Sequence, residues 1–266
     1  MTTDLVARRT YLDPQRRTIV ARAIAGSLAG LVPIPFLDDW AKAAVLGGGY
    51  KRIAAAHGVD LDDDAVKSLV HGKTPPPSIA QMAASGIMYR IAGLAAKRML
   101  LALATVNRVR AASRTFTTMT LFDHYCARLH IGPALDGPTA LAVREEISRA
   151  IDQTPGALSF HPFRRGLSSA ARSALKATLE LADLASGGAL RRLLTKKSES
   201  APITEAEAVN DVEKALETQL ANQGGFLART VAAVEVQLSA DGNPFLDGAI
   251  EALDRRWRAR RLAGIE

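Results

Sequence analysis

Residues 23–72 read AIAGSLAGLVPIPFLDDWAKAAVLGGGYKRIAAAHGVDLDDDAVKSLVHG and contain the clearest indications of the fold. Alanine and leucine, both strong helix formers, dominate this stretch, and nowhere do apolar and polar residues alternate strictly as in a half-buried strand. Pro33 and Pro35 end the first helix because proline cannot continue one. Gly58 and Gly72 are normal stops for two more helices. The stretch therefore predicts three consecutive helices and an all-α fold.

Three consecutive glycines, Gly47, Gly48 and Gly49, lie in the middle of the second predicted helix. Each glycine costs a helix about 1 kcal/mol relative to alanine, so the run indicates either a break or a very close contact with another element. Glycine amides followed by the cations Lys51 and Arg52 are also a way to bind phosphate. A phosphate loop normally follows a strand and opens a helix, whereas this run lies inside one. We therefore favour the helix contact.

The rest of the chain has a similar character. Of its 266 residues, 48% are hydrophobic and only 5% are aromatic. Asp13-Pro14 is a typical helix start, with aspartate as the cap and proline in the first turn. Further helices are predicted over residues 79–130 (with a possible break at 107–113), 138–152, 163–185 and 244–262. We expect a multi-helix bundle of about eight to ten helices that pack through small residues.

A proline-rich segment, residues 73–77, is the clearest linker in the chain. Three consecutive prolines favour a stiff, extended spacer. This predicts an N-terminal helical module over residues 1–72 and a larger helical bundle over residues 78–266. One continuous domain is the alternative.

Charge and cysteine content narrow the compartment and the partners. The net charge is +7 and the pI is about 9.8, which favours a polyanionic partner, either an anionic membrane surface or nucleic acid. The single cysteine, Cys126, excludes an internal disulfide and fits the reducing cytoplasm. The apolar stretches 23–37 and 79–106 are interrupted by prolines or by cations, so we expect no membrane-spanning helix.

The pattern of helix ends and turns in residues 23–72 resembles that of a known group of proteins. Its elements are a small-residue helix, the turn Val32-Pro33-Ile34-Pro35, the acids Asp38 and Asp39, the stop His57-Gly58-Val59 and the acidic helix start at residues 62–64. These are similar to a bacterial helical family of unknown function that is associated with Era-like GTPases and, more distantly, to the EcsC family. The resemblance implies a helical module near the inner membrane or near a GTPase. It transfers no catalytic residues, and the chain itself lacks a P-loop motif.

Asp123, Cys126 and His130 share one face of a predicted helix, with His124 beside them. All are acceptable metal ligands, and cysteine with histidine suits zinc. A buried face that holds a small thiol and a hydrogen-bonded histidine is the interpretation we favour. The neighbouring carboxylates Glu145-Glu146 are interpreted as solvent-facing charge. No nucleophile motif is found; we predict no catalytic residues and no cofactor, and we lean against an enzyme.

The C-terminal helix combines an apolar stripe, Leu246, Ile250, Leu253 and Trp257, with dense arginine. Such a helix binds an anionic membrane or a phosphate backbone, or it simply packs on the core. The residues predicted to contact an anion or membrane are Arg255, Arg256, Trp257, Arg258, Arg260 and Arg261. The leading hypothesis is a non-enzymatic cytoplasmic protein, peripheral on the inner membrane or bound to a protein partner such as a GTPase. A nucleic-acid-binding protein and a helical metalloprotein or enzyme are the alternatives.

Overall fold

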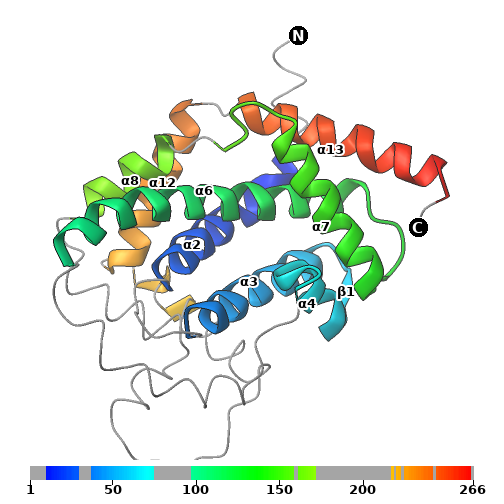
Figure 1. Cartoon of the computed structure of the whole chain (residues 1–266), viewed down its shortest axis with the longest axis horizontal. Helices are drawn as coiled ribbons and strands as arrows, with labels where there is room; N and C mark the ends of the chain where they lie inside the picture. Colours follow the sequence, from blue (N-terminus) through cyan, green and yellow to red (C-terminus); the bar gives the residue numbers. More distant parts are fainter. Residues whose placement is uncertain are drawn as a thin grey trace, which may run out of the picture.

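The computed structural model describes residues 10–29, 37–74, 97–158, 161–171, 217–218, 220–222, 225–241 and 244–264. This part of the chain is an all-α, multi-helix bundle, as predicted (Figure 1). Its helices are the 3-10 helix η1 (Thr10–Leu12) and the α-helices α2 (Asp13–Ala29), α3 (Leu37–Ala56), α4 (Asp63–His71), α6 (Lys97–Arg128), α7 (Gly137–Asp152), α8 (His161–Ala171), α12 (Phe226–Asp241) and α13 (Pro244–Leu262). Two short strands, β1 (Asp60–Leu61) and β2 (Ala134–Leu135), pair in parallel.

Helix α2 is the buried centre of the bundle. Every residue from Ile19 to Ser27 is buried, and the helix packs against α3, α6 and α12 (Figure 1). Ala23 and Gly26 are part of this segment, so small residues let neighbouring helices approach closely. The segment also contains a charge: Arg22 is only 2% exposed, and its Nη1 donates a hydrogen bond to the carbonyl oxygen of Val45 at 2.8 Å.

Helix α3 runs without a break through the three glycines. An ideal Cβ placed on Gly49 would lie 2.5 Å from Cε of Met119 and 2.8 Å from Cδ of Arg22. Gly49 therefore lies in a very close contact between α3, α6 and α2, and a side chain there would require Met119 or Arg22 to shift. This agrees with the interpretation of the glycine run as a helix contact rather than a phosphate loop.

Local signals set the ends of α4 and α7. The side chain of Asp62 accepts a hydrogen bond from the amide of Ala65 at 2.5 Å, and Gly72 ends α4 with a φ of +68°. Asp136 caps α7 in the same way, accepting from the amide of Thr139 at 2.9 Å. The β1–β2 pair was not predicted, because two residues are too short to show a strand periodicity.

Helix α6 is the longest helix in the described residues and has no break at residues 107–113. Its predicted start near residue 79 lies outside the described residues. The helix predicted over residues 163–185 is α8, which begins at His161; residues beyond 171 also lie outside the described part.

The two predicted parts of the chain share one hydrophobic core. Arg144 of α7 donates hydrogen bonds to the carbonyl oxygens of Leu69 and Val70 at the end of α4. The β1–β2 pair joins the same two parts, with Asp60 opposite Ala134. Of the predicted linker 73–77, only Lys73 and Thr74 are described, and Lys73 forms an ion pair with Glu145 at 2.7 Å.

Candidate functional site

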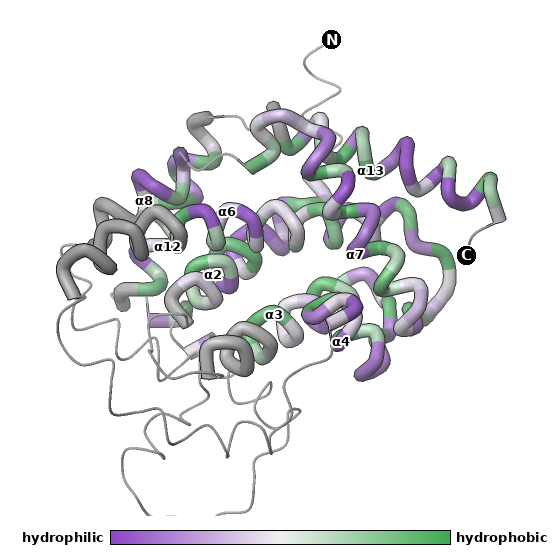
Figure 2. The backbone as a smooth tube through the Cα atoms, viewed as in Figure 1, coloured by the Kyte–Doolittle hydropathy of each residue, from purple (hydrophilic) through white to green (hydrophobic). Residues whose placement is uncertain are grey.

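The inner face of α13 is part of the core. Its predicted apolar stripe, Leu246, Ile250, Leu253 and Trp257, is buried, and α13 packs on α7 and α6. The Trp257 ring meets the Tyr125 ring edge-on, with 4.8 Å between centroids. Hydrophobic and hydrophilic segments follow one another along α13, as in a helix with one apolar and one charged face (Figure 2). Trp257, predicted as a surface contact, therefore lies in the core.

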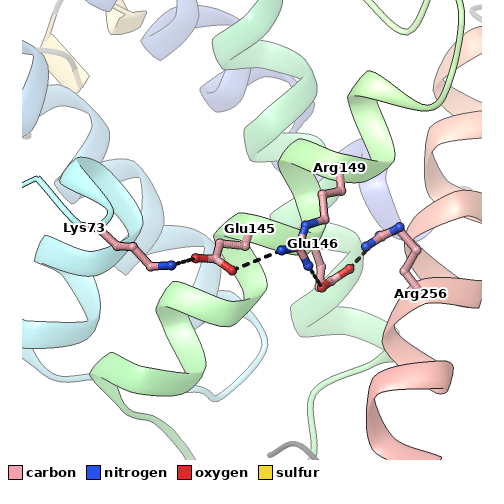
Figure 3. A network of polar contacts seen from close by, with 5 residues as sticks. All are labelled: Lys73, Glu145, Glu146, Arg149 and Arg256. Carbon is pink, nitrogen blue, oxygen red and sulfur yellow. Dashed lines mark hydrogen bonds and ion pairs between the residues drawn. The ribbon is translucent and has the colours of Figure 1, made fainter. Parts of the chain in front are cut away.

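A buried carboxylate fastens α13 to α7. Glu146 has a side chain only 5% exposed, and its two oxygens pair with Arg149 at 2.7 Å and with Arg256 at 2.6 Å (Figure 3). Its neighbour Glu145 faces the other way and pairs with Lys73 and Arg149. The interpretation of Glu145-Glu146 as solvent-facing charge is therefore wrong for Glu146. Helical periodicity did not reveal it because the partner Arg256 is distant in sequence.

The predicted arginines of α13 separate into two groups. Arg256 binds Glu146, and Arg261 donates a hydrogen bond to the carbonyl oxygen of Leu129, in the segment that follows α6. These two hold the helix in place. Arg255 and Arg258 are exposed and Arg260 is half-buried.

Arg255 and Arg258 lie on the outer face of α13, opposite the core. Together with Leu262, these two arginines are spaced i, i+3 and i+7, so the three residues share one side of the helix. Leu262 is 91% exposed. One acid, Glu251, lies one turn before Arg255 and is also exposed. We call Arg255, Arg258 and Leu262 the outer face of α13.

The three candidate metal ligands do not converge. Oδ1 of Asp123 bonds to Nε2 of His57 at 2.6 Å, and Nδ1 of His130 lies 3.4 Å from the hydroxyl of Tyr125. Cys126 is buried, and this burial, followed by the charge of Asp123, raises the pKa of its thiol. Across the described ranges, no three His, Cys, Asp or Glu side chains are grouped so that they could hold a metal ion. This face of α6 therefore agrees with the interpretation favoured from the sequence, a buried thiol beside a hydrogen-bonded histidine.

Next to this face, His124 joins three elements. Its Nδ1 lies 2.5 Å from the hydroxyl of Tyr11 in η1, and its Nε2 lies 2.8 Å from Oδ1 of Asp254 in α13. A carboxylate only accepts hydrogen bonds, so Nε2 of His124 carries a proton and donates a hydrogen bond to Asp254. The other ring nitrogen, Nδ1, lies within hydrogen-bond distance of the Tyr11 hydroxyl. Sequence reasoning missed Tyr11, Asp254 and His57, since no local spacing links them to α6.

Within the described residues, no helix is both long enough and apolar enough to cross a bilayer.

Comparison of the chain with models of protein families, with curated proteins and with solved structures gives no match. The resemblance of residues 23–72 to the GTPase-associated helical family stays a prediction.

Proposed function

We propose that this protein binds peripherally to an anionic membrane surface through the outer face of α13. The observation that carries the proposal is that the residues of α13 fall into two groups, one in contact with the core and one exposed. Its apolar stripe and two of its arginines hold it on the core, while Arg255 and Arg258 remain exposed on the opposite side.

The geometry favours surface binding over insertion of the whole helix. An amphipathic helix that lies in a bilayer buries its apolar face there, but this face is already buried against α6 and α7. What α13 offers to a membrane is fixed positive charge. Each arginine near an anionic surface contributes about 1 kcal/mol, so a small group of arginines on a basic protein gives reversible binding.

Nucleic acid presents the same phosphate chemistry and is the main rival. Single-stranded nucleic acid is normally bound with aromatic side chains on which bases stack. The aromatic residue among the arginines, Trp257, is buried against Tyr125 and is not available for stacking. This burial supports binding to a membrane surface better than binding to single-stranded nucleic acid. A protein partner, including the GTPase implied by the resemblance, is the third candidate.

The test is co-sedimentation with vesicles of phosphatidylcholine alone and of phosphatidylcholine with phosphatidylglycerol. Point variants of the full chain are needed, because removing α13 would uncover the core. The test variant is Arg255→Gln/Arg258→Gln. Its matched control is Arg114→Gln/Arg229→Gln, which removes the same charge from exposed positions on α6 and α12.

We expect binding to the anionic vesicles only, weakening as salt screens the charges. The Arg255→Gln/Arg258→Gln variant should lose most of this binding, and the control should keep it. Equal losses in both variants would mean that net charge, not α13, attracts the protein. No binding by the unaltered chain, or tighter binding to duplex or single-stranded nucleic acid, would overturn the proposal.

A further inference from the structure

Two large apolar side chains are exposed on segments that lie next to each other. Ile131 is 78% exposed and Leu262 is 91% exposed. Ile131 lies in the segment between α6 and α7, and Leu262 ends α13. The hydrogen bond from Arg261 to the carbonyl oxygen of Leu129 joins these two segments, one residue before Leu262 and two residues before Ile131 in the sequence. In Figure 1 the segment after α6 bulges toward the C-terminal end of α13.

The segment that carries Ile131 is held on both sides. Before it, Leu129 is buried and the His130 ring packs against Tyr125, with 5.7 Å between centroids. After it, the carbonyl oxygen of Pro133 accepts a hydrogen bond from the amide of Asp60 at 2.8 Å. Ile131 is therefore fixed in an exposed position.

Gly132 makes this position possible. Its φ is +107°, a conformation that side chains other than glycine rarely adopt. The turn at Gly132 carries the chain from Ile131 back to Pro133 and the β1–β2 pair. Single exposed apolar side chains are common on protein surfaces. Here two of them lie on neighbouring segments beside the arginines of α13, and this combination is what points to a partner.

Cations accompany Leu262 on α13. Arg258 is one turn before Leu262, and Arg260 and Arg261 lie between them in sequence. Apolar side chains next to arginines match a bilayer surface, where acyl chains lie beneath anionic headgroups. Duplex nucleic acid offers phosphates but no comparable apolar layer at its surface.

We propose that Ile131 and Leu262 form an apolar tip that enters the acyl region of an anionic membrane while the arginines of α13 bind the headgroups. This inference rests on the proposed function and adds what the tip would supply: affinity for lipid that a soluble polyanion cannot replace.

The test compares Ile131→Ser/Leu262→Ser with the control Val236→Ser. Val236, on α12, is the other large hydrophobic residue found exposed in the described residues, at 63%. Each protein is titrated with phosphatidylcholine–phosphatidylglycerol vesicles and with heparin, a soluble polyanion. The tip variant should bind vesicles at least about tenfold more weakly, as expected for two aliphatic side chains withdrawn from an apolar layer. Its affinity for heparin, and the binding of the control to both, should be unchanged.

A second measurement reports insertion directly. An environment-sensitive fluorophore attached at Ile131→Cys should shift to the blue with anionic vesicles and not with heparin, while the same label at Val236→Cys should not shift with either. The buried Cys126 does not compete for the label.

The outcomes separate the two proposals. If the tip variant binds vesicles as tightly as the control and the label at position 131 does not shift, the tip inference is wrong. Loss of binding in Arg255→Gln/Arg258→Gln would then still support the proposed function. If the unaltered protein binds heparin but no vesicles, both proposals fail.

Discussion

Nε2 of His57 lies 2.6 Å from Oδ1 of Asp123, although 66 positions separate the two residues. His57 follows the last residue of α3, and Asp123 is fully buried in α6. The next residue of α6, His124, bonds to Asp254 of α13. Two consecutive positions of one helix thus connect it to two others through histidine–aspartate pairs. This arrangement predicts how the fold responds to pH.

The carboxyl group of Asp123 should contribute stability at low pH that is lost as the pH rises. Burial, the largest influence, raises the pKa of Asp123, and the hydrogen bond and charge of His57 and the charge of His124 oppose it only in part. A raised pKa means that the folded state holds the proton more tightly than the unfolded chain. The stabilising contribution is therefore complete below the unfolded pKa and is lost as pH rises through the folded pKa.

The test is urea unfolding of the unaltered protein and of Asp123→Asn between about pH 4 and pH 7. Asparagine keeps an oxygen that can accept from His57 but cannot ionise. The free energy of unfolding of Asp123→Asn should fall less with rising pH over this window than that of the unaltered protein. If the free energy of unfolding depended on pH in the same way for both proteins, Asp123 would not be the source of the pH dependence.

Arg256 should stabilise the fold more than Arg149, although both bind Glu146. The side chain of Arg256 is 24% exposed and that of Arg149 is 52% exposed. Removing Arg256 leaves a buried carboxylate with one exposed partner and loosens α13. We expect Arg256→Ala to cost about 2 kcal/mol and Arg149→Ala less than about 1 kcal/mol.

Chemical denaturation measures both losses. The variants Glu146→Gln and Glu146→Gln/Arg256→Ala complete a double-mutant cycle, and the coupling between the two residues should exceed about 1 kcal/mol. Equal losses for Arg149→Ala and Arg256→Ala would contradict the arrangement.

Gly49→Ala should destabilise the protein even though alanine is the better helix former. The gain in helix propensity is about 1 kcal/mol, but the new Cβ would lie 2.5 Å from Met119 and 2.8 Å from Arg22. Overpacking of this kind typically costs about 1–3 kcal/mol, and two neighbours must move here, so we expect a net loss.

Gly26→Ala is the matched control, because it is also a buried glycine within a helix. The nearest atom to its new Cβ would be Cγ1 of Val45 at 3.8 Å, an ordinary contact. This substitution should be neutral or stabilising by up to about 1 kcal/mol. Thermal unfolding of the two variants checks the pair of predictions, and a similar loss in both would remove the special role of Gly49.

The thiol of Cys126 should be unreactive in the folded protein. Burial and the charge of Asp123 raise its pKa, and the thiolate is the reactive form. At about pH 8 a thiol reagent such as iodoacetamide should modify Cys126 only after denaturant is added. Rapid modification of the native protein would show that this face of α6 opens to solvent.

Local chemistry was sufficient to predict most of the helices. Asp13-Pro14 begins α2, Asp62 and Gly72 bound α4, and Pro244 begins α13, each where sequence reasoning placed it. The prediction of an apolar inner face for α13 is also confirmed, because its apolar residues recur at helical spacing. Caps, prolines and periodicity act within a few residues, and a sequence displays such short-range effects directly.

Contacts between polar side chains, in contrast, arise only when the helices pack together. Glu146 and Arg256 lie 110 positions apart, and His124 and Asp254 lie 130 apart. Their spacing along the chain carries no trace of contact, and for this reason the sequence does not distinguish Glu146 from a surface charge. The helices and their apolar faces follow from the amino-acid sequence, because they depend on neighbours in the chain. The packing of α13 on α6 and α7 decided which arginines hold the fold together and which remain exposed, because that depends on neighbours in space.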